Sequence, residues 1–262
     1  MPTLSNICVE LINEHLANLD QPQALEDEEV VHQIRVLTKR LRAAWHLAQP
    51  ACGESFANQR RDALRDLSAL VAHSRDQAVQ LALAEKFHLE HPEIPRQSLQ
   101  ALFPPAPSTP GSSSSPSITS TRQILKAEIA AWMEVRLGDN ERAALRHQWR
   151  KSLKKAKALS LETAGSTDSE VWHSWRKAVK RLRYQREFLA MVNPRILGTK
   201  DSRIRNLGTR LGDHNDLAVF SRQLDSSKLK PAELQQLKKA VAMHDRDIKR
   251  NCRRLGRRLF GG

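Results

Sequence analysis

The sequence contains little cysteine and no long apolar run. Its three cysteines, Cys8, Cys52 and Cys252, lie far apart and form no CxxC pair. This spacing argues against a disulfide framework and a zinc site, and it favours a reducing compartment. No run approaches the roughly 18 consecutive apolar residues of a membrane span. The N-terminal segment MPTLSNICVELINEHLANLD lacks the cationic start of a signal peptide. We therefore expect a cytoplasmic protein that does not span a membrane.

Sequence motifs for catalysis are also missing. There is no Walker loop, no GxGxxG, no GxSxG and no acidic cluster suited to the Mg²⁺ that phosphoryl transfer normally requires. The segment GTRLGDHND does not qualify as a phosphate loop. We predict that the chain is not an enzyme and uses no cofactor or metal.

Acidic residues are scarce relative to basic ones. Asp and Glu total 29 against 43 Lys and Arg, which gives a formal net charge of +14. Because so much positive charge repels itself, it predicts a polyanionic partner: nucleic acid, an acidic membrane surface or a phosphate polymer. The net charge alone does not choose among these partners.

Strict alternation of polar and apolar residues is absent, so no sheet is predicted. Apolar residues instead recur three and four positions apart, as in Leu64, Leu67, Leu70 and Val71 and again in Leu234, Leu237 and Val241. This period is typical of helices, and the sequence predicts an all-α protein.

One segment interrupts the helical pattern. Residues 103–121, FPPAPSTPGSSSSPSITST, contain five prolines and a serine run, which predicts a flexible linker. The linker would separate a first helical bundle at residues 4–102 from a second at 122–262, with about four helices in each.

The two sides of this linker repeat each other. HQIRVLTKRLR at residues 32–42 aligns without a gap with HSWRKAVKRLR at residues 173–183. Farther along, LSALVAHSRDQAV at 67–79 aligns with LGTRLGDHNDLAV at 207–219. The distance from the His to the Asp of each copy is 44 residues in the first and 43 in the second. These ordered matches indicate an internal duplication, and two similar helical units tend to pack about a pseudo-twofold axis.

Each copy places its cations along one face of a helix. At about 100° per residue, the first set falls within about 80° of arc, opposite an apolar face that includes Leu37 and Leu41. We call these sets the first cationic stripe, which is His32, Arg35, Lys39 and Arg42, and the second cationic stripe, which is His173, Arg176, Lys180 and Arg183. Each stripe would be about 15 Å long.

Such stripes suggest an anionic ligand. Like charges three or four residues apart destabilise a helix by roughly a few tenths of a kcal/mol per pair, and a bound anion would relieve this cost. The alternative is that the cations pair with acids on neighbouring helices, for which Asp76 and Asp216 are candidates.

A metal at the two histidines is disfavoured. A divalent cation would be repelled by the neighbouring Lys and Arg side chains, and it prefers carboxylates or thiolates. The imidazoles are better suited to donate hydrogen bonds to an anion that supports their protonation. The HxxH pattern of EKFHLEH, residues 85–91, is a weak metal pattern that a polar helix end explains better.

These repeated motifs resemble the CHAD domain, the conserved histidine α-helical domain. The resemblance rests on VHQIRVLTKRLRAAW and VWHSWRKAVKRLRYQREFL, each followed by its later motif, SRDQAV or LGDHNDLAV. It implies an all-helical fold of two four-helix bundles with pseudo-twofold symmetry, and binding of inorganic polyphosphate in a basic cavity between them. Some family members are fused to a triphosphate-tunnel enzyme domain, to which nothing here corresponds. We therefore expect the binding module alone, as a single domain over residues 1–262.

The resemblance also implies which residues bind. The family's histidines and basic residues correspond here to His32, Arg35, Lys39, Arg40, Arg42, His173, Arg176, Lys177, Lys180, Arg181 and Arg183. Further basic residues complete the predicted cavity wall, and these are Arg150, Lys154, Lys157, Arg210, Arg250, Arg253 and Arg257.

The sequence thus predicts a non-enzymatic polyphosphate-binding protein of the cytoplasm, associated with polyphosphate granules. A flexible chain of closely spaced charges suits two parallel basic stripes better than a rigid duplex does. Nucleic-acid binding is the alternative. It is opposed by tryptophans that do not alternate with basic residues as a stacking platform would, although Trp172 and Trp175 flank His173. A polyphosphate-cleaving enzyme is disfavoured by the missing metal-binding carboxylates.

Overall fold

The computed structural model describes residues 2–21, 23–71, 75–92, 94–103, 118–193, 201–225, 227 and 229–261, without the side chains of 75–78 and 201. These residues form ten α-helices, one 3-10 turn at Ala24–Glu26 and no strand, so the predicted all-α class is confirmed. None of the described helices is long and apolar enough to cross a bilayer. The helices are α1 Leu4–Ala17, α2 Glu28–Cys52, α3 Glu54–Leu70, α4 Arg75–Glu90, α5 Arg96–Gln100, α6 Ile118–Glu134, α7 Glu141–Gly165, α8 Ser169–Val192, α9 Asp201–Asp225 and α10 Pro231–Phe260.

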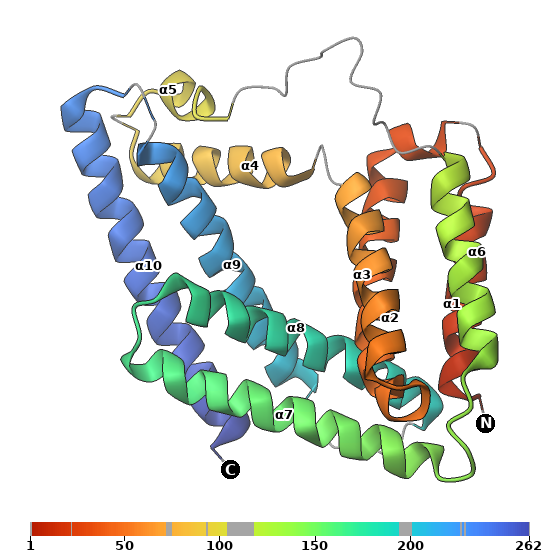
Figure 1. Cartoon of the computed structure of the whole chain (residues 1–262). Helices are drawn as coiled ribbons and strands as arrows, with labels where there is room; N and C mark the ends of the chain where they lie inside the picture. Colours follow the sequence, from red (N-terminus) through yellow and green to blue (C-terminus); the bar gives the residue numbers. More distant parts are fainter. Residues whose placement is uncertain are drawn as a thin grey trace.

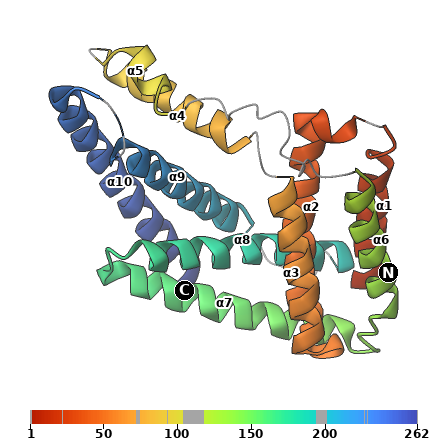
Figure 2. The same cartoon turned by 45° about the horizontal axis from the view of Figure 1, so that its top comes forward.

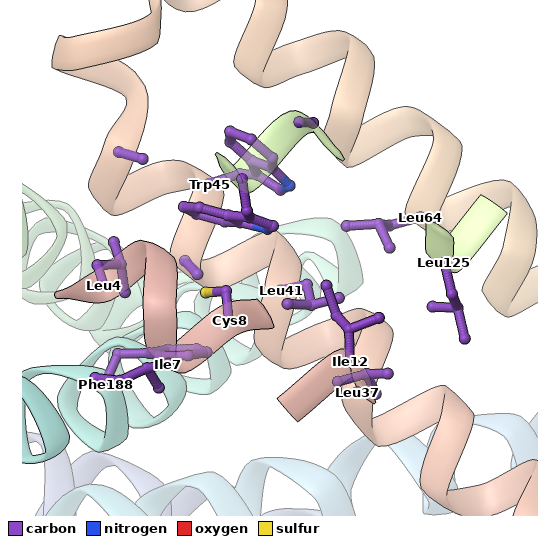
Figure 3. Close-up of a cluster of buried hydrophobic side chains, with 14 of the residues drawn as sticks. Leu4, Ile7, Cys8, Ile12, Leu37, Leu41, Trp45, Leu64, Leu125 and Phe188 are labelled. Atoms are coloured by element: carbon purple, nitrogen blue, oxygen red, sulfur yellow. The ribbon is translucent and has the colours of Figure 1, made fainter. Parts of the chain in front are cut away.

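Helices α1, α2, α3 and α6 pack around one apolar core (Figure 1). Leu37 and Leu41, which lie behind the first cationic stripe, are fully buried in it. Figure 3 shows them beside Ile12 of α1, with Trp45 above. The Trp45 ring stacks on Trp132 of α6, with ring centroids 3.9 Å apart. The apolar back of the first stripe therefore anchors α2 as expected.

Helices α7 to α10 pack around a second core, and α8 takes part in both cores. Trp175 and Leu182 of α8 are buried among residues of α7, α9 and α10. Phe188, one turn beyond the second stripe, is buried in the first core instead, where Figure 3 shows it near Ile7. Helix α8 thus ties the two groups together, and its stripe lies on the part that packs in the second core.

The chain groups its helices differently from the expected division at the linker. Helix α6 follows the linker yet packs on α1, whereas α4 and α5 precede it yet pack on α9 and α10 (Figure 2). The physical reason is aromatic burial, because Phe87 of α4 stacks on Phe220 of α9 with ring centroids 5.0 Å apart. Within the described residues, five α-helices, rather than about four, lie on each side of the linker.

Most of the predicted linker lies outside the described residues. Its two ends belong to packed structure, since Phe103 is buried against Phe220 and α6 begins at Ile118. In the second copy a single helix, α9, runs through residues 201–225, whereas the corresponding part of the first copy is divided between α3 and α4. This division lets α4 leave α3 and reach α9.

The two stripe-bearing helices begin with matching caps. Asp27 accepts a hydrogen bond from the Glu29 backbone N–H at 2.8 Å, and Asp168 accepts one from Glu170 at 2.9 Å. An aspartate at this position satisfies a free N–H of the first turn. Each cap precedes its stripe histidine by the same number of residues, so the duplication extends to the helix starts and sets both stripes in the same helical register.

A buried carboxylate joins α6 to α2 and α3. Glu128 is fully buried. It accepts hydrogen bonds from Trp45 Nε1 at 2.8 Å and from Arg60 Nε at 2.8 Å. Burial raises the pKa of Glu128, while Arg60 and the bond from Trp45 act in the opposite direction.

We expect Glu128→Ala to lower the free energy of unfolding by about 3 kcal/mol, because it leaves the Arg60 guanidinium and the Trp45 indole without a partner in the core. Urea denaturation at pH 7 measures the change. Glu134→Ala, at an exposed position of the same helix, is the control and should change stability by less than about 0.5 kcal/mol. A loss no larger than that of the control would contradict this account.

Candidate functional site

Helices α2 and α8 pack against each other, and their cationic faces line one pocket of about 880 Å³. The pocket brings together residues that lie far apart in sequence and come from both copies of the duplication. The predicted site residues in its lining are Arg35, Lys39, Arg42, His173, Arg176, Lys177, Lys180 and Arg181.

The opposite wall comes from α4, the residues after α5, and α9. Val79 and Val219, which align in the two copies, both line the pocket, as do Leu102 and Phe103. Gln80 donates a hydrogen bond to the backbone carbonyl of Asp216 at 3.2 Å, which fixes α4 to α9. Each copy therefore contributes both its stripe and its later motif to one pocket.

The electrostatic balance of the pocket is strongly positive. Its lining holds seven Lys and Arg residues, and among the described lining residues Asp216 is the one carboxylate. Burial lowers the pKa of Lys180 to about 8, with further lowering by Arg176 and Lys39. Burial likewise lowers the pKa of Arg181 to about 10, helped by Arg61 and Arg42. These shifts mean that the folded protein holds the cations at an energetic cost, which an anion in the pocket would reduce.

The two stripe histidines differ in position. His173 lines the pocket and forms a side-chain hydrogen bond with Asn215. Burial lowers its pKa, Lys177 and Arg176 add to this, and the bond to Asn215 opposes it. His173 is therefore neutral at pH 7 without a ligand, and a neutral imidazole still has one N–H to donate. His32, in contrast, is not part of the lining.

Two predicted site residues on the stripe-bearing helices pair with an acid instead. Arg183 Nε lies 3.2 Å from one carboxylate oxygen of Glu187, and Arg40 Nε lies 3.6 Å from the other. Neither arginine lines the pocket. For Arg40 the alternative of pairing with an acid on a neighbouring helix holds, although the partner is Glu187 rather than the expected Asp76 or Asp216. Arg183 pairs with Glu187 within its own helix. The side chain of Asp76 lies outside the described residues.

The predicted residues on α7, α9 and α10 do not line the pocket either. Arg253 donates to the Thr163 carbonyl at 3.1 Å, and its guanidinium lies 5.3 Å from the centre of the Trp172 ring. Arg210 and Arg250 pair with aspartates of their own helices. In all, the predicted residues outside the lining are His32, Arg40, Arg150, Lys154, Lys157, Arg183, Arg210, Arg250, Arg253 and Arg257.

Sequence reasoning missed residues at one end of the pocket. His46 lines it, and the signal was present, because His46 follows Arg42 by four residues and so continues the first stripe. Arg61 of α3 acts on His46, Arg42 and Arg181 electrostatically. No periodicity in the sequence distinguished Arg61 from other surface arginines. Tyr184, another lining residue, lies on the same face of α8 as the second stripe.

The weak metal pattern on α4 has a structural explanation. His88 Nδ1 lies 3.0 Å from the Ile94 carbonyl oxygen, Glu90 contacts His244 at 2.7 Å, and Glu85 pairs with Arg96 at 2.7 Å. These bonds hold α4 to α5 and α10. No group of three or more His, Cys, Asp or Glu within the described part of the chain could hold a metal ion.

Comparison with models of known families identifies the family of this chain. The family model of the CHAD domain matches residues 10–225, a span that contains both cationic stripes and both later motifs. The chain belongs to the CHAD family. The resemblance inferred from the repeated motifs is thereby confirmed. No curated protein and no solved structure matches the chain.

The lowered pKa of Lys180 predicts a stability effect in this CHAD protein. Below about pH 8 Lys180 is charged in both states, and the folded state bears the cost. Between pH 8 and its ordinary pKa near 10.5 the folded state loses the proton first, so the cost disappears as the pH rises. Lys180→Met should therefore raise the free energy of unfolding at pH 7 by about 1 kcal/mol, and by less at pH 9.5.

Urea denaturation at the two pH values tests this. Lys151→Met, on the exposed side of α7, removes the same charge outside the pocket and should have little effect. A Lys180→Met protein less stable than the native protein at pH 7 would contradict the prediction.

Proposed function

We propose that this CHAD protein binds inorganic polyphosphate, without cleaving it, in the pocket between α2 and α8. The observation that supports this most is the shared lining, in which cations of both stripes face one space with a single described carboxylate. Membership of the CHAD family is consistent with a polyphosphate-type partner. A chain of closely spaced negative charges can contact several cations of both helices along the pocket at the same time.

Aligned pairs in the lining support a symmetric origin for the site. Arg35 and Arg176 are equivalent in the two copies, and so are Lys39 and Lys180. We propose that the two duplicated units are related by an approximate twofold axis near the crossing of α2 and α8. We also propose that the protein acts in the cytoplasm, in association with polyphosphate granules.

The burial of the tryptophans weighs against nucleic acid as the ligand. Single-stranded nucleic acid is held largely by stacking its bases on exposed aromatic rings. Trp45, Trp132, Trp172 and Trp175 are all fully buried, and Trp149 is packed against both cores. No tryptophan lines the pocket. The tryptophans thus stabilise the cores and do not form a platform for bases.

A competition between polyanions tests the proposal. Titration with polyphosphate and with single- and double-stranded oligonucleotides, at equal charge and salt, should show clearly tighter binding of polyphosphate. Because ion pairing releases counterions, its affinity should fall linearly in a log–log plot, by roughly tenfold or more between about 50 and 200 mM salt. Polyphosphate incubated with the protein and Mg²⁺ should release no phosphate. Equal affinity for oligonucleotides would favour nucleic acid, and steady phosphate release would indicate an enzyme.

Charge reversal tests whether both stripes act on one ligand. Arg35→Glu with Lys39→Glu, and separately Arg176→Glu with Lys180→Glu, should each weaken polyphosphate binding by more than about tenfold, since each pair adds repulsion as well as removing attraction. Arg250→Glu with Arg254→Glu, on exposed positions of α10, is the matched control. Far-UV circular dichroism should show the helical content intact.

The shared-pocket model predicts that both double reversals weaken binding. If one double reversal abolished binding while the other left affinity and stoichiometry as in the native protein, only one copy would hold the ligand.

A further inference from the structure

The two stripes are equivalent in sequence up to their last arginine and then diverge. Four residues after Arg42 the first copy has His46, and four residues after Arg183 the second copy has Glu187. Both lie one turn beyond their stripe on the same face of α2 and α8. A neutralising carboxylate is thus present at one of two equivalent positions and replaced by an imidazole at the other.

Glu187 compensates the arginines around it. Its two oxygens pair with Arg183 and Arg40, at 3.2 and 3.6 Å. Neither arginine takes part in the lining of the pocket. At this end of the α2–α8 crossing the duplicated cations therefore already have an anionic partner within the fold.

At the other end, the position equivalent to Glu187 holds His46, and the carboxylate that acts on Arg42 is Asp62 of α3. Arg42 and Arg181, the counterparts of Arg183 and Arg40, both line the pocket together with His46. Arg61 of α3 and Lys155 of α7 add positive charge there. Burial and these four cations lower the pKa of His46 to about 2. His46 is consequently neutral and supplies no compensating charge.

Arg61 provides a second, independent observation. One terminal nitrogen of its guanidinium, Nη1, is buried without a hydrogen-bond partner, while Nη2 contacts Asn58. Arg61 is not part of the pocket lining, but it acts electrostatically on Arg42, His46 and Arg181, which are. The acids that offset its charge, Asp62 and Glu54, lie on its own helix α3. Asp62 also pairs with Arg65 at 3.0 Å. A buried donor of this kind is costly unless a ligand satisfies it.

We propose that Arg42, His46 and Arg181, with the neighbouring Arg61 of α3, form an anion subsite at one end of the pocket, which takes the doubly charged terminal phosphoryl group of a polyphosphate chain. This inference rests on the proposed polyphosphate binding. A terminal phosphate carries close to two negative charges at neutral pH, as a phosphomonoester does, whereas each phosphate inside the chain carries one. Planar guanidinium groups match phosphate oxygens in paired hydrogen bonds. A bound chain would therefore have one orientation, with its terminal phosphoryl group beside His46. At the other end Glu187 already neutralises the neighbouring arginines.

Exchanging the two divergent residues tests the subsite. His46→Glu places at the first position the residue that α8 carries at the second, and it should weaken the binding of tripolyphosphate at least tenfold in isothermal titration calorimetry. Gln235→Glu, exposed on α10, makes the same change in net charge outside the pocket and should weaken binding no more than twofold. Arg61→Gln, on the partly exposed side of α3, should also weaken it at least fivefold.

The reciprocal variant predicts a gain. Glu187→His releases Arg40 and Arg183 and should raise either the affinity for tripolyphosphate severalfold or the stoichiometry above that of the native protein. Structural damage does not produce such a gain. A Glu187→His protein with native or weaker binding would overturn the proposal, as would His46→Glu and Arg61→Gln proteins that bind like the native one.

Chain ends are tested with long polyphosphate whose terminal groups are blocked as phosphoramidates. The loss caused by His46→Glu should shrink to less than threefold on blocked chains, and an equal loss on blocked and free chains would refute the assignment to a chain end. If the native protein bound no polyphosphate at all, the proposed function would fail. Normal binding of long chains together with an unaffected His46→Glu variant would refute the subsite alone.

Discussion

Two helices that carry like charges, α2 and α8, are held against each other by apolar packing on their opposite faces. Leu37 and Leu41 anchor α2 in the first core, and Leu182 and Phe188 anchor α8 in both. Each fully buried side chain of this size contributes about 1.5–3 kcal/mol, whereas each like-charge pair costs about a few tenths of a kcal/mol on a helix surface. The stabilisation by apolar burial exceeds the charge repulsion. The two cationic faces therefore stay together around one pocket, although they would separate in a pair of isolated helices. The cost persists in the lowered pKa of Lys180.

The placement of a few carboxylates decides which cations are available to a ligand. Glu128 neutralises Arg60 inside the first core, and Glu187 neutralises Arg40 and Arg183 outside the pocket lining. The pocket itself receives one described carboxylate, Asp216. These carboxylates leave the pocket lining with an excess of positive charge, which the proposed polyanion would balance.

The pocket is a product of both duplicated units and of the chain that crosses between them. Helix α4 leaves α3, buries Phe87 against Phe220, and brings Val79 and Gln80 opposite the stripes. Without this crossing the pocket would lose the part of its opposite wall that α4 forms, and ionic strength would screen the field of the stripes more strongly. With it, the cations lie in a partly desolvated space in which interactions with an anion are stronger. The four fully buried tryptophans are part of the cores, which is why they cannot stack on bases.

The sequence by itself determined the all-α class, the duplication, the family and the faces of the two stripe-bearing helices, because these depend on local periodicity and on matches along the chain. Leu37, Leu41 and Leu182 are buried as their spacing predicts. Only the tertiary structure decided which cations meet. Arg40 and Arg42 look alike in sequence, yet one pairs with Glu187 and the other lines the pocket, and the basic residues of α10 lie elsewhere. Helical periodicity gives the direction of a side chain about its own axis. It carries no information on which helix lies opposite, since α4 and α6 exchange sides through packing contacts between residues far apart in the chain.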